Sequence, residues 1–296
     1  MLVIGGSASK KLAEKVSKEI NSKFVPVENK QFPDGEIYVR IPEKVQGEKT
    51  LIIQSTHQNP NQYYMELFLL LDAAKDLGAE KVSAVIPYFA YARQDKRFEP
   101  GEAISLQTVS KLIESAGADE IFLIDLHAHR IENPPEVFGI PAYNLTAAST
   151  LARYVDENYD LKNPVILGPD EEAEQWAKKA GETIDADWDY MVKKRLGSKK
   201  VEITPRELEV EGRDVVIIDD IISTGGTMTE AIKILKEHNV KKIYACCTHP
   251  VLSNNALENI KNAGAEEVIG TDTIESEISK VSVAPVIAES IRQGEG

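Results

Sequence analysis

The chain has 296 residues, of which 42% are hydrophobic and 28% charged, and its net charge is −14 at pH 7. This composition is typical of a soluble globular protein that is long enough for two hydrophobic cores. The negative charge disfavours nucleic acid or an anionic membrane as the main partner. An anionic small substrate would therefore need a local cluster of cations or a metal ion.

The N-terminus, MLVIGG, lacks the basic segment and long apolar stretch of a signal peptide, and no run approaches the roughly 18 apolar residues of a membrane span. The two cysteines, Cys246 and Cys247, are adjacent in an apolar run. Adjacent cysteines rarely have the geometry of an ordinary disulfide. We therefore expect a cytoplasmic protein whose cysteines are reduced and buried.

Short apolar segments alternate with amphipathic helical segments along the chain. LVIG at 2–5 precedes a helical segment at 7–20, and TLIIQS at 50–55 precedes another at 62–78. The apolar segments that follow are KVSAVIPY, EIFLIDL, PVILG, DVVIIDD, KIYACC and EVIGT. This alternation predicts an α/β fold of mainly parallel sheets flanked by helices. The strands are apolar at successive positions, as burial on both faces requires.

The two halves of the chain resemble each other. AGADEIFLID from Ala116 matches AGAEEVIGTD from Ala263, and GEKTLIIQS from Gly47 aligns with GRDVVIIDD from Gly212. Chance similarity between common α/β patterns is the alternative to a duplication. A duplication predicts two similar domains built on one plan.

The boundary between these domains is expected near FGIPAYNLTAAST, residues 138–150, where a glycine and a proline interrupt regular structure. We therefore expect one domain at 1–143 and a second at 144–296. The last helix would be able to pack back on the first domain.

The stretch VVIIDDIISTGGTM, residues 215–228, combines two carboxylates with a hydroxyl-rich glycine loop. The carboxylates come at the carboxyl end of a predicted strand, where open parallel sheets bind ligands. The loop opens a helix expected at roughly 228–238. Its glycines allow close backbone approach, and the helix N-terminus suits a phosphate. The carboxylates suit a pair of vicinal hydroxyls, so a sugar phosphate such as ribose 5-phosphate would satisfy both parts.

The alternative is an acidic turn with Ser223 or Thr227 as a helix cap. A nucleotide P-loop is excluded because no lysine follows the glycines. The aligned part of the first half has Gln54-Ser55 and no glycine pair, so we expect no phosphate cradle there. The candidate sugar-phosphate residues are Asp219, Asp220, Ser223, Thr224, Gly225, Gly226 and Thr227.

This stretch resembles the phosphoribosyl-pyrophosphate loop of proteins with the type I phosphoribosyltransferase fold. Three further segments resemble motifs of the ribose-phosphate pyrophosphokinase family: FPDGEIYVRI at 32–41, YARQDKRFEPGEAIS at 91–105 and DLHAHR at 125–130. Together they span most of the chain in the family's order. The resemblance implies two tandem type I phosphoribosyltransferase-like domains.

The implied reaction moves the β,γ-diphosphoryl group of ATP to the 1-hydroxyl of ribose 5-phosphate, giving phosphoribosyl pyrophosphate and AMP for nucleotide biosynthesis. Two alternatives stay open: a phosphoribosyltransferase that consumes this product, and a non-catalytic regulatory paralogue. A paralogue of that kind should have lost Lys193, Arg195 or the glycine pair, and this chain keeps all of them.

The resemblance also implies an ATP site in the first half, completed by a loop from a neighbouring subunit, and hence a homo-oligomer. That loop includes Pro33-Asp34-Gly35, which is also good β-turn chemistry, and both interpretations can hold. The implied ATP-binding residues are Phe32, Asp34, Gly35, Glu36, Arg93, Gln94 and His127.

Lys193 and Arg195 match the family's catalytic Lys-x-Arg, and Arg195 is also implied in ribose 5-phosphate binding. Attack on the β-phosphorus builds negative charge that positioned cations stabilise. The nearby Lys194, Lys199 and Lys200 are equally compatible with a solvated basic hairpin.

Magnesium is the implied cofactor, with His127 and Asp170 as the implied metal-site residues. Because magnesium prefers oxygen ligands and keeps its waters, we expect His127 to contact phosphate or metal-bound water. A helix cap is the alternative for Asp170. Glu171 and Glu172 stand where the family usually has glycine, which argues against a close backbone approach of ligand there.

Overall fold

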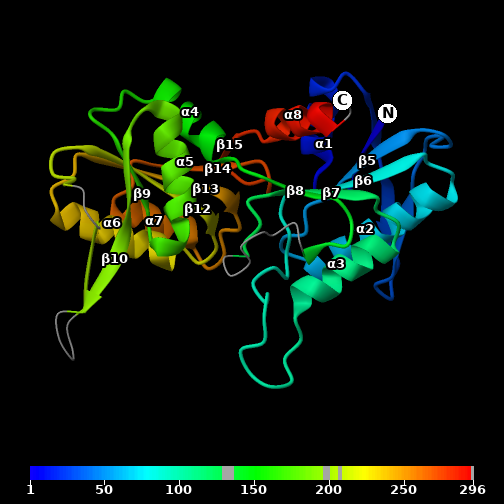
Figure 1. Cartoon of the computed structure of the whole chain (residues 1–296), viewed down its shortest axis with the longest axis horizontal. Helices are drawn as coiled ribbons and strands as arrows, with labels where there is room; N and C mark the ends of the chain where they lie inside the picture. Colours follow the sequence, from blue (N-terminus) through cyan, green and yellow to red (C-terminus); the bar gives the residue numbers. More distant parts are fainter. Residues whose placement is uncertain (129–136, 196–200, 206–208, 295–296) are drawn as a thin grey trace. The chain divides into compact units, whose positions relative to one another are not determined.

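The computed structural model describes residues 1–128, 137–195, 201–205 and 209–294, with the backbone alone at 193–195 and 201–204 (Figure 1). The chain divides into two compact units. Unit 1 comprises Met1–Leu145, Thr273–Glu275 and Ser282–Gly296, and unit 2 comprises Thr146–Asp272 and Ser276–Val281. Within the described ranges, no helix is both long and apolar enough to cross a membrane.

Unit 1 is a parallel sheet with helices on both faces. Its strands are β1 Leu2–Gly5, β2 Lys23–Pro26, β5 Lys49–Ile53, β6 Lys81–Ile86, β7 Glu120–Ile124 and β8 Ala142–Leu145. They lie in the order β2-β1-β5-β6-β7-β8, and each of these pairings is parallel. Its helices are α1 Lys10–Glu19, α2 Pro60–Asp76, α3 Ser105–Ser115 and α8 Ala284–Gly294. A separate antiparallel hairpin is formed by β3 Glu28–Gln31 and β4 Ile37–Arg40.

Successive strand residues in unit 1 point to opposite faces of its sheet. Ile4 and Ile52 pack in one buried cluster with Leu67 of α2 and Ile113 of α3. Figure 1 shows α2 and α3 on this face and α1 and α8 on the other. Helix α8, the last in the described chain, packs against α1. The apolar character of successive strand positions thus reflects burial on both faces.

Unit 2 repeats this plan with a sheet of seven described strands, against six in unit 1. Its strands are β9 Val165–Gly168, β10 Asp187–Arg195, β11 Val201–Pro205, β12 Asp214–Ile222, β13 Lys242–Pro250, β14 Glu267–Thr271 and β15 Ser279–Val281. They lie in the order β11-β10-β9-β12-β13-β14-β15, and within the described part of this sheet only the β10–β11 pairing is antiparallel. Its helices are α4 Ala148–Asn158, the 3₁₀ helix η2 Glu171–Ala173, α5 Glu174–Ile184, α6 Gly226–Glu237 and α7 Ala256–Ala263.

Strand β12 supplies both cores of unit 2. Val215 and Ile217 pack with side chains of α6 and α7, whereas Val216 and Ile218 pack with side chains of α4 and α5. Cys246, on β13, is fully buried and unpaired, and burial raises the pKa of its thiol to about 12. The burial agrees with the expectation from the sequence.

The two sheets share one topology. Strands β1, β5, β6, β7 and β8 occur in the same spatial order as β9, β12, β13, β14 and β15. In this order β5 corresponds to β12, as the alignment of TLIIQS with VVIIDD predicts. The predicted α/β class with two similar, mainly parallel domains is confirmed.

Candidate active site

The paired carboxylates lie inside β12, because this strand extends beyond the predicted end. Pairing of β12 with β9 ends at Ile217, whereas pairing with β13 continues to Ile222. Asp219 and Asp220 therefore lie past the carboxyl end of β9 while still held by β13. The expectation that the carboxylates end the strand was wrong by two residues, since one neighbouring strand is longer than the other.

The glycine loop leads directly into α6. This helix begins at Gly226, two residues earlier than predicted, and its N-cap residue is Gly225 with φ 75°. Ser223 and Thr227 are therefore not the cap residue, contrary to the alternative interpretation. As a glycine, the N-cap residue has no side chain that could accept a hydrogen bond from the first amides of α6. An anion would satisfy these amides.

The two glycines of the loop have different surroundings. A β-carbon on Gly225 would lie 3.2 Å from Ala256 Cβ and from Ile260 Cδ1, so α7 packs closely on this residue. Among the residues that the structure describes, a β-carbon on Gly226 would meet only Thr224 Oγ1, at 3.8 Å. Gly226, Thr224 and Thr227 are exposed. The first glycine therefore serves backbone conformation and packing, and the second leaves an open backbone.

Asp219 belongs to a local concentration of negative charge. Its backbone neighbour Asp220 is 1% exposed and donates its N–H to Asp219 Oδ1 at 2.9 Å. Burial, followed by the charges of Asp220 and Asp170, raises the pKa of Asp219 well above its ordinary value. Hydroxyl donors or a nearby cation would relieve this repulsion.

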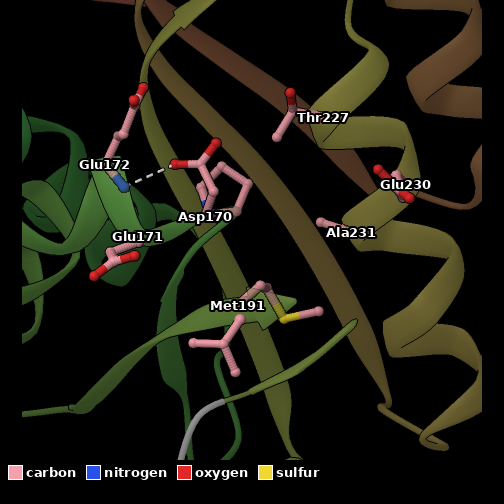
Figure 2. A pocket seen from close by; sticks show the side chains of 9 residues that line it. Asp170, Glu171, Glu172, Met191, Thr227, Glu230 and Ala231 are labelled. Carbon is pink, nitrogen blue, oxygen red and sulfur yellow. Dashed lines mark hydrogen bonds between the residues drawn. The ribbon is translucent and has the colours of Figure 1, made fainter. Parts of the chain in front are cut away.

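Asp170 follows β9 and caps η2, accepting a hydrogen bond from Glu172 N at 3.0 Å (Figure 2). Asp170 is therefore a helix cap, which was the alternative interpretation of this residue. It also lines a pocket of about 460 Å³. Figure 2 shows Asp170 on one side of this pocket and Thr227 and Glu230, from α6, on the other. The remaining lining residues are Pro169, Glu171, Glu172, Met191, Val192 and Ala231.

Lys193 and Arg195 continue the strand that contributes Met191 and Val192 to this pocket. Their backbones pair with Ile203 and Val201 across the antiparallel β10–β11 ladder. Their side chains, and those of Lys194, Lys199 and Lys200, lie outside the described residues.

Unit 1 has its own pocket, of about 280 Å³, lined by the segment that follows β6, by the first residue of α3 and by His127. It brings together Arg93, Gln94 and His127, three of the residues implied in ATP binding. The remaining lining residues, which the sequence did not single out, are Tyr88, Phe89, Tyr91, Ala92 and Ser105.

Strained backbone borders the unit 1 pocket. Tyr91 has φ 68°, and its carbonyl accepts a hydrogen bond from Ser105 Oγ at 3.1 Å. Asp125, two residues before His127, has φ 40°. The turn that presents His127 is held by Leu126 N, which donates to Asn144 Oδ1 at 3.0 Å. Residues in such conformations often cluster at functional sites.

The segment Phe32–Glu36 forms the turn of the β3–β4 hairpin. Phe32 N donates to Glu36 O at 2.7 Å, Gly35 N donates to Phe32 O at 2.9 Å, and Gly35 has φ 97°. Asp34 Oδ1 accepts from Glu36 N at 3.2 Å. Phe32 is 40% exposed, with Lys30 Nζ 4.9 Å from its ring centroid. The turn chemistry is therefore present, and in the described part of the chain these residues do not line the 280 Å³ pocket.

Comparison with known proteins decides between the families that this geometry permits. Residues 1–117 match the N-terminal domain of ribose phosphate pyrophosphokinase, and residues 136–285 match the phosphoribosyl transferase domain. A ribose-phosphate pyrophosphokinase from Methanothermobacter thermautotrophicus is 43% identical over 291 residues, covering 98% of this chain and all of the relative. This chain belongs to the ribose-phosphate pyrophosphokinase family.

Other members of the ribose-phosphate pyrophosphokinase family agree with this assignment. The Methanopyrus kandleri relative is 40% identical over 296 residues, covering the whole of both chains. The crystal structure of phosphoribosylpyrophosphate synthetase from Mycobacterium smegmatis has a TM-score of 0.86 and 31% identity, covering 100% of this chain and 99% of that one. The tandem type I phosphoribosyltransferase-like architecture implied by the motifs is confirmed.

For a ribose-phosphate pyrophosphokinase, the donor set fits magnesium through oxygen atoms. Asp170 lies close enough to Asp219 to raise its pKa, and both are carboxylates, which magnesium prefers. Among the residues that the structure describes, no group of three or more His, Cys, Asp or Glu side chains could hold a metal by itself. Magnesium bound by such a site usually takes its other ligands from substrate phosphates and water. The other implied metal-site residue, His127, belongs to unit 1.

Proposed function

We propose that this chain transfers the β,γ-diphosphoryl group of ATP to the 1-hydroxyl of ribose 5-phosphate, producing phosphoribosyl pyrophosphate and AMP. The observation that carries the proposal is the strand-to-helix connection from Asp219 to Thr227, where a carboxylate pair precedes a helix start with a glycine cap. A transferase that consumes the product could share this loop. The match of residues 1–117 to the family's N-terminal domain favours synthesis.

The sugar phosphate would bind in unit 2. Its phosphate would accept hydrogen bonds from the amides and hydroxyls of Ser223, Thr224, Gly225, Gly226 and Thr227, since amides at a helix N-terminus favour an anion. The vicinal hydroxyls of ribose would donate to Asp219 and Asp220. This arrangement gives the raised pKa of Asp219 a function, because a diol supplies the hydrogen bonds that the carboxylate pair needs.

ATP would bind in unit 1. Arg93 offers a guanidinium for phosphate or for stacking on the base, and Gln94 and His127 line the same pocket. Phe32, Asp34, Gly35 and Glu36 would reach the ATP site of another copy of the chain. An exposed aromatic ring on a two-stranded hairpin supports this role. The enzyme would accordingly be a homo-oligomer.

Bound magnesium would neutralise phosphate charge and hold the diphosphoryl group for in-line attack. Asp170 is the carboxylate proposed to hold it in unit 2, and His127 is proposed to contact phosphate or metal-bound water. Glu171 and Glu172 also line the Asp170 pocket, and their negative charge would favour a cation there.

In the reaction, the ribose 1-oxygen forms a bond to the β-phosphorus while the bond from the β-phosphorus to the AMP oxygen breaks. Lys193 and Arg195 would stabilise the negative charge that develops on the bridging and non-bridging oxygens. Arg195 would also contact ribose 5-phosphate. Exclusion of water from this step would suppress ATP hydrolysis.

The direct test is incubation of the purified protein with ATP, Mg²⁺ and ribose 5-phosphate, followed by separation of adenine nucleotides. We expect AMP to form in equal amount to phosphoribosyl pyrophosphate, and only when the sugar phosphate is present. ADP as product would identify an ordinary kinase. Absence of sugar-dependent turnover would favour a regulatory paralogue, and consumption of phosphoribosyl pyrophosphate with a nucleobase would favour a transferase.

The shared ATP site has its own test. Phe32→Ala and Arg93→Ala variants should each be nearly inactive, and mixing them under conditions that allow subunit exchange should restore activity. Restoration requires that Phe32 of one copy serve Arg93 of another. Failure of the mixture, with light scattering showing mixed oligomers, would exclude a shared site. A cytoplasmic location is proposed from the substrates and can be checked by cell fractionation.

A further inference from the structure

The loop from Gln94 to Glu102 is closed by one side chain. Glu102 Oε2 accepts hydrogen bonds from Gln94 Nε2 at 3.0 Å, Phe98 N at 2.7 Å and Glu99 N at 3.0 Å. The carbonyl oxygen of Glu102 accepts from Arg97 Nε at 2.9 Å. Four donors, spread over six residues of the loop, thus converge on a single residue.

These hydrogen bonds favour the ionised form of Glu102. An anionic oxygen accepts stronger hydrogen bonds than a neutral one, and it can accept several at once. The hydrogen bonds from Glu99 N, Phe98 N and the Gln94 amide hold the pKa of Glu102 below its ordinary value. The group that closes the loop is therefore the charged carboxylate of Glu102.

The same contacts fix the amide of Gln94, which lines the 280 Å³ pocket. Its Nε2 donates to Glu102 Oε2 and also to Lys96 O at 3.1 Å. Both partners are acceptors, so the amide nitrogen must face them and the assignment of its two ends is unambiguous. With both N–H groups used inside the loop, the amide can offer only its carbonyl oxygen to a ligand.

We propose that Glu102 is a positioning residue for the nucleotide site: it closes the Gln94–Glu102 loop and sets the orientation of the Gln94 amide. Glu102 does not line the pocket within the described residues, so it acts through Gln94. The proposal deepens the proposed function, since it rests on ATP binding at this pocket. Ordering Gln94 before ATP arrives lowers the entropic cost of binding.

The test compares Glu102→Gln with Glu99→Gln, which removes the same charge from the same loop. The side chain of Glu99, unlike its backbone, makes none of the four contacts above. We expect Glu102→Gln to raise the KM for ATP about tenfold, the value of one charge-assisted hydrogen bond. The KM for ribose 5-phosphate and the Tm should stay close to those of the parent. Glu99→Gln should match the parent in all three.

A double-mutant cycle with Gln94→Ala shows whether Glu102 acts through Gln94. If it does, the combined variant should lose little more ATP affinity than Gln94→Ala alone. Full additivity would overturn the proposal. An unchanged KM for ATP in Glu102→Gln would also overturn it. A fall in Tm together with equal increases in the KM values for ATP and ribose 5-phosphate would do the same, because that pattern is expected of a purely structural residue.

ATP binding measured by calorimetry, with Mg²⁺ and without ribose 5-phosphate, separates this proposal from the proposed function. If the parent binds ATP but makes no AMP, the reaction assignment fails and the role of Glu102 is still measured. If Glu102→Gln binds ATP as tightly as the parent in this assay, the positioning role fails whatever the reaction.

Discussion

Gln54 fills the space above Gly6 in unit 1. A β-carbon on Gly6 would lie 2.7 Å from Gln54 Cδ, and the Gln54 side chain is fully buried. Gln54 Oε1 accepts from Ala8 N at 3.1 Å, and Glu66 Oε1 accepts from Ser7 N at 2.8 Å. The amides of Ser7 and Ala8, before α1, therefore already have acceptors from the protein and are not open to a phosphate.

Gly6→Ala should destabilise unit 1 by about 1–3 kcal/mol, because the added methyl group overpacks against Gln54. Urea unfolding monitored by circular dichroism measures this change. A Gly6→Ala/Gln54→Ala double variant loses the contacts with Gln54 Oε1 and Cδ and keeps only the one with Cβ, at 3.2 Å, so the two destabilising effects should not add. Additive effects would show that Gln54 is not what restricts position 6.

The two loop glycines should respond differently to alanine. Gly225→Ala should destabilise the protein by about 1–2 kcal/mol, because an L residue is strained at φ 75° and α7 leaves little room. Gly226→Ala should fold with nearly the parent Tm and bind ribose 5-phosphate at least tenfold more weakly, since its methyl group would meet the phosphate. Calorimetric titration and thermal unfolding of both variants check this. Equal losses of stability would contradict the distinction.

Asp219→Asn should weaken ribose 5-phosphate binding while stabilising the unliganded protein at neutral pH. The raised pKa of Asp219 means that the fold favours its protonated form, so stability is lost as pH rises from the ordinary value of 3.8 through the raised value. Asparagine removes that loss. The variant should therefore have the higher Tm at pH 7, and the difference should shrink towards pH 4. A variant that is less stable than the parent at pH 7 would contradict the assigned direction.

Lys193→Ala should lower kcat by about 10²–10³-fold, the usual effect of removing one group that stabilises transition-state charge. Ribose 5-phosphate affinity should change little. Steady-state kinetics and equilibrium binding measure the two quantities, and Lys194→Ala is the neighbouring control, expected within a few-fold of the parent. Activity of Lys193→Ala within a few-fold of the parent would remove Lys193 from the mechanism.

The buried strands were predictable because parallel strands with two covered faces must be apolar at nearly every position. β6 and β7 lie within segments identified from the sequence, and β5, β12 and β13 overlap theirs but extend beyond them at one end. β3 was not found, since all four of its residues are exposed and carry no apolar pattern. The edge strand β8 was missed for a similar reason, because its central Tyr143 and Asn144 are exposed.

The sequence by itself determined the fold class, the internal repeat and the chemistry of the loop at residues 219–227, because these depend on residue type and local order. Tertiary structure decided which amides remain for a ligand. Gln54 and Glu66 satisfy those of unit 1, whereas the start of α6 in unit 2 has a glycine cap. It also brought Arg93, Gln94 and His127 to one pocket and placed Glu102 where it accepts a hydrogen bond from Gln94. Such relationships depend on where strands end and which side chains meet across the chain, which no local pattern specifies.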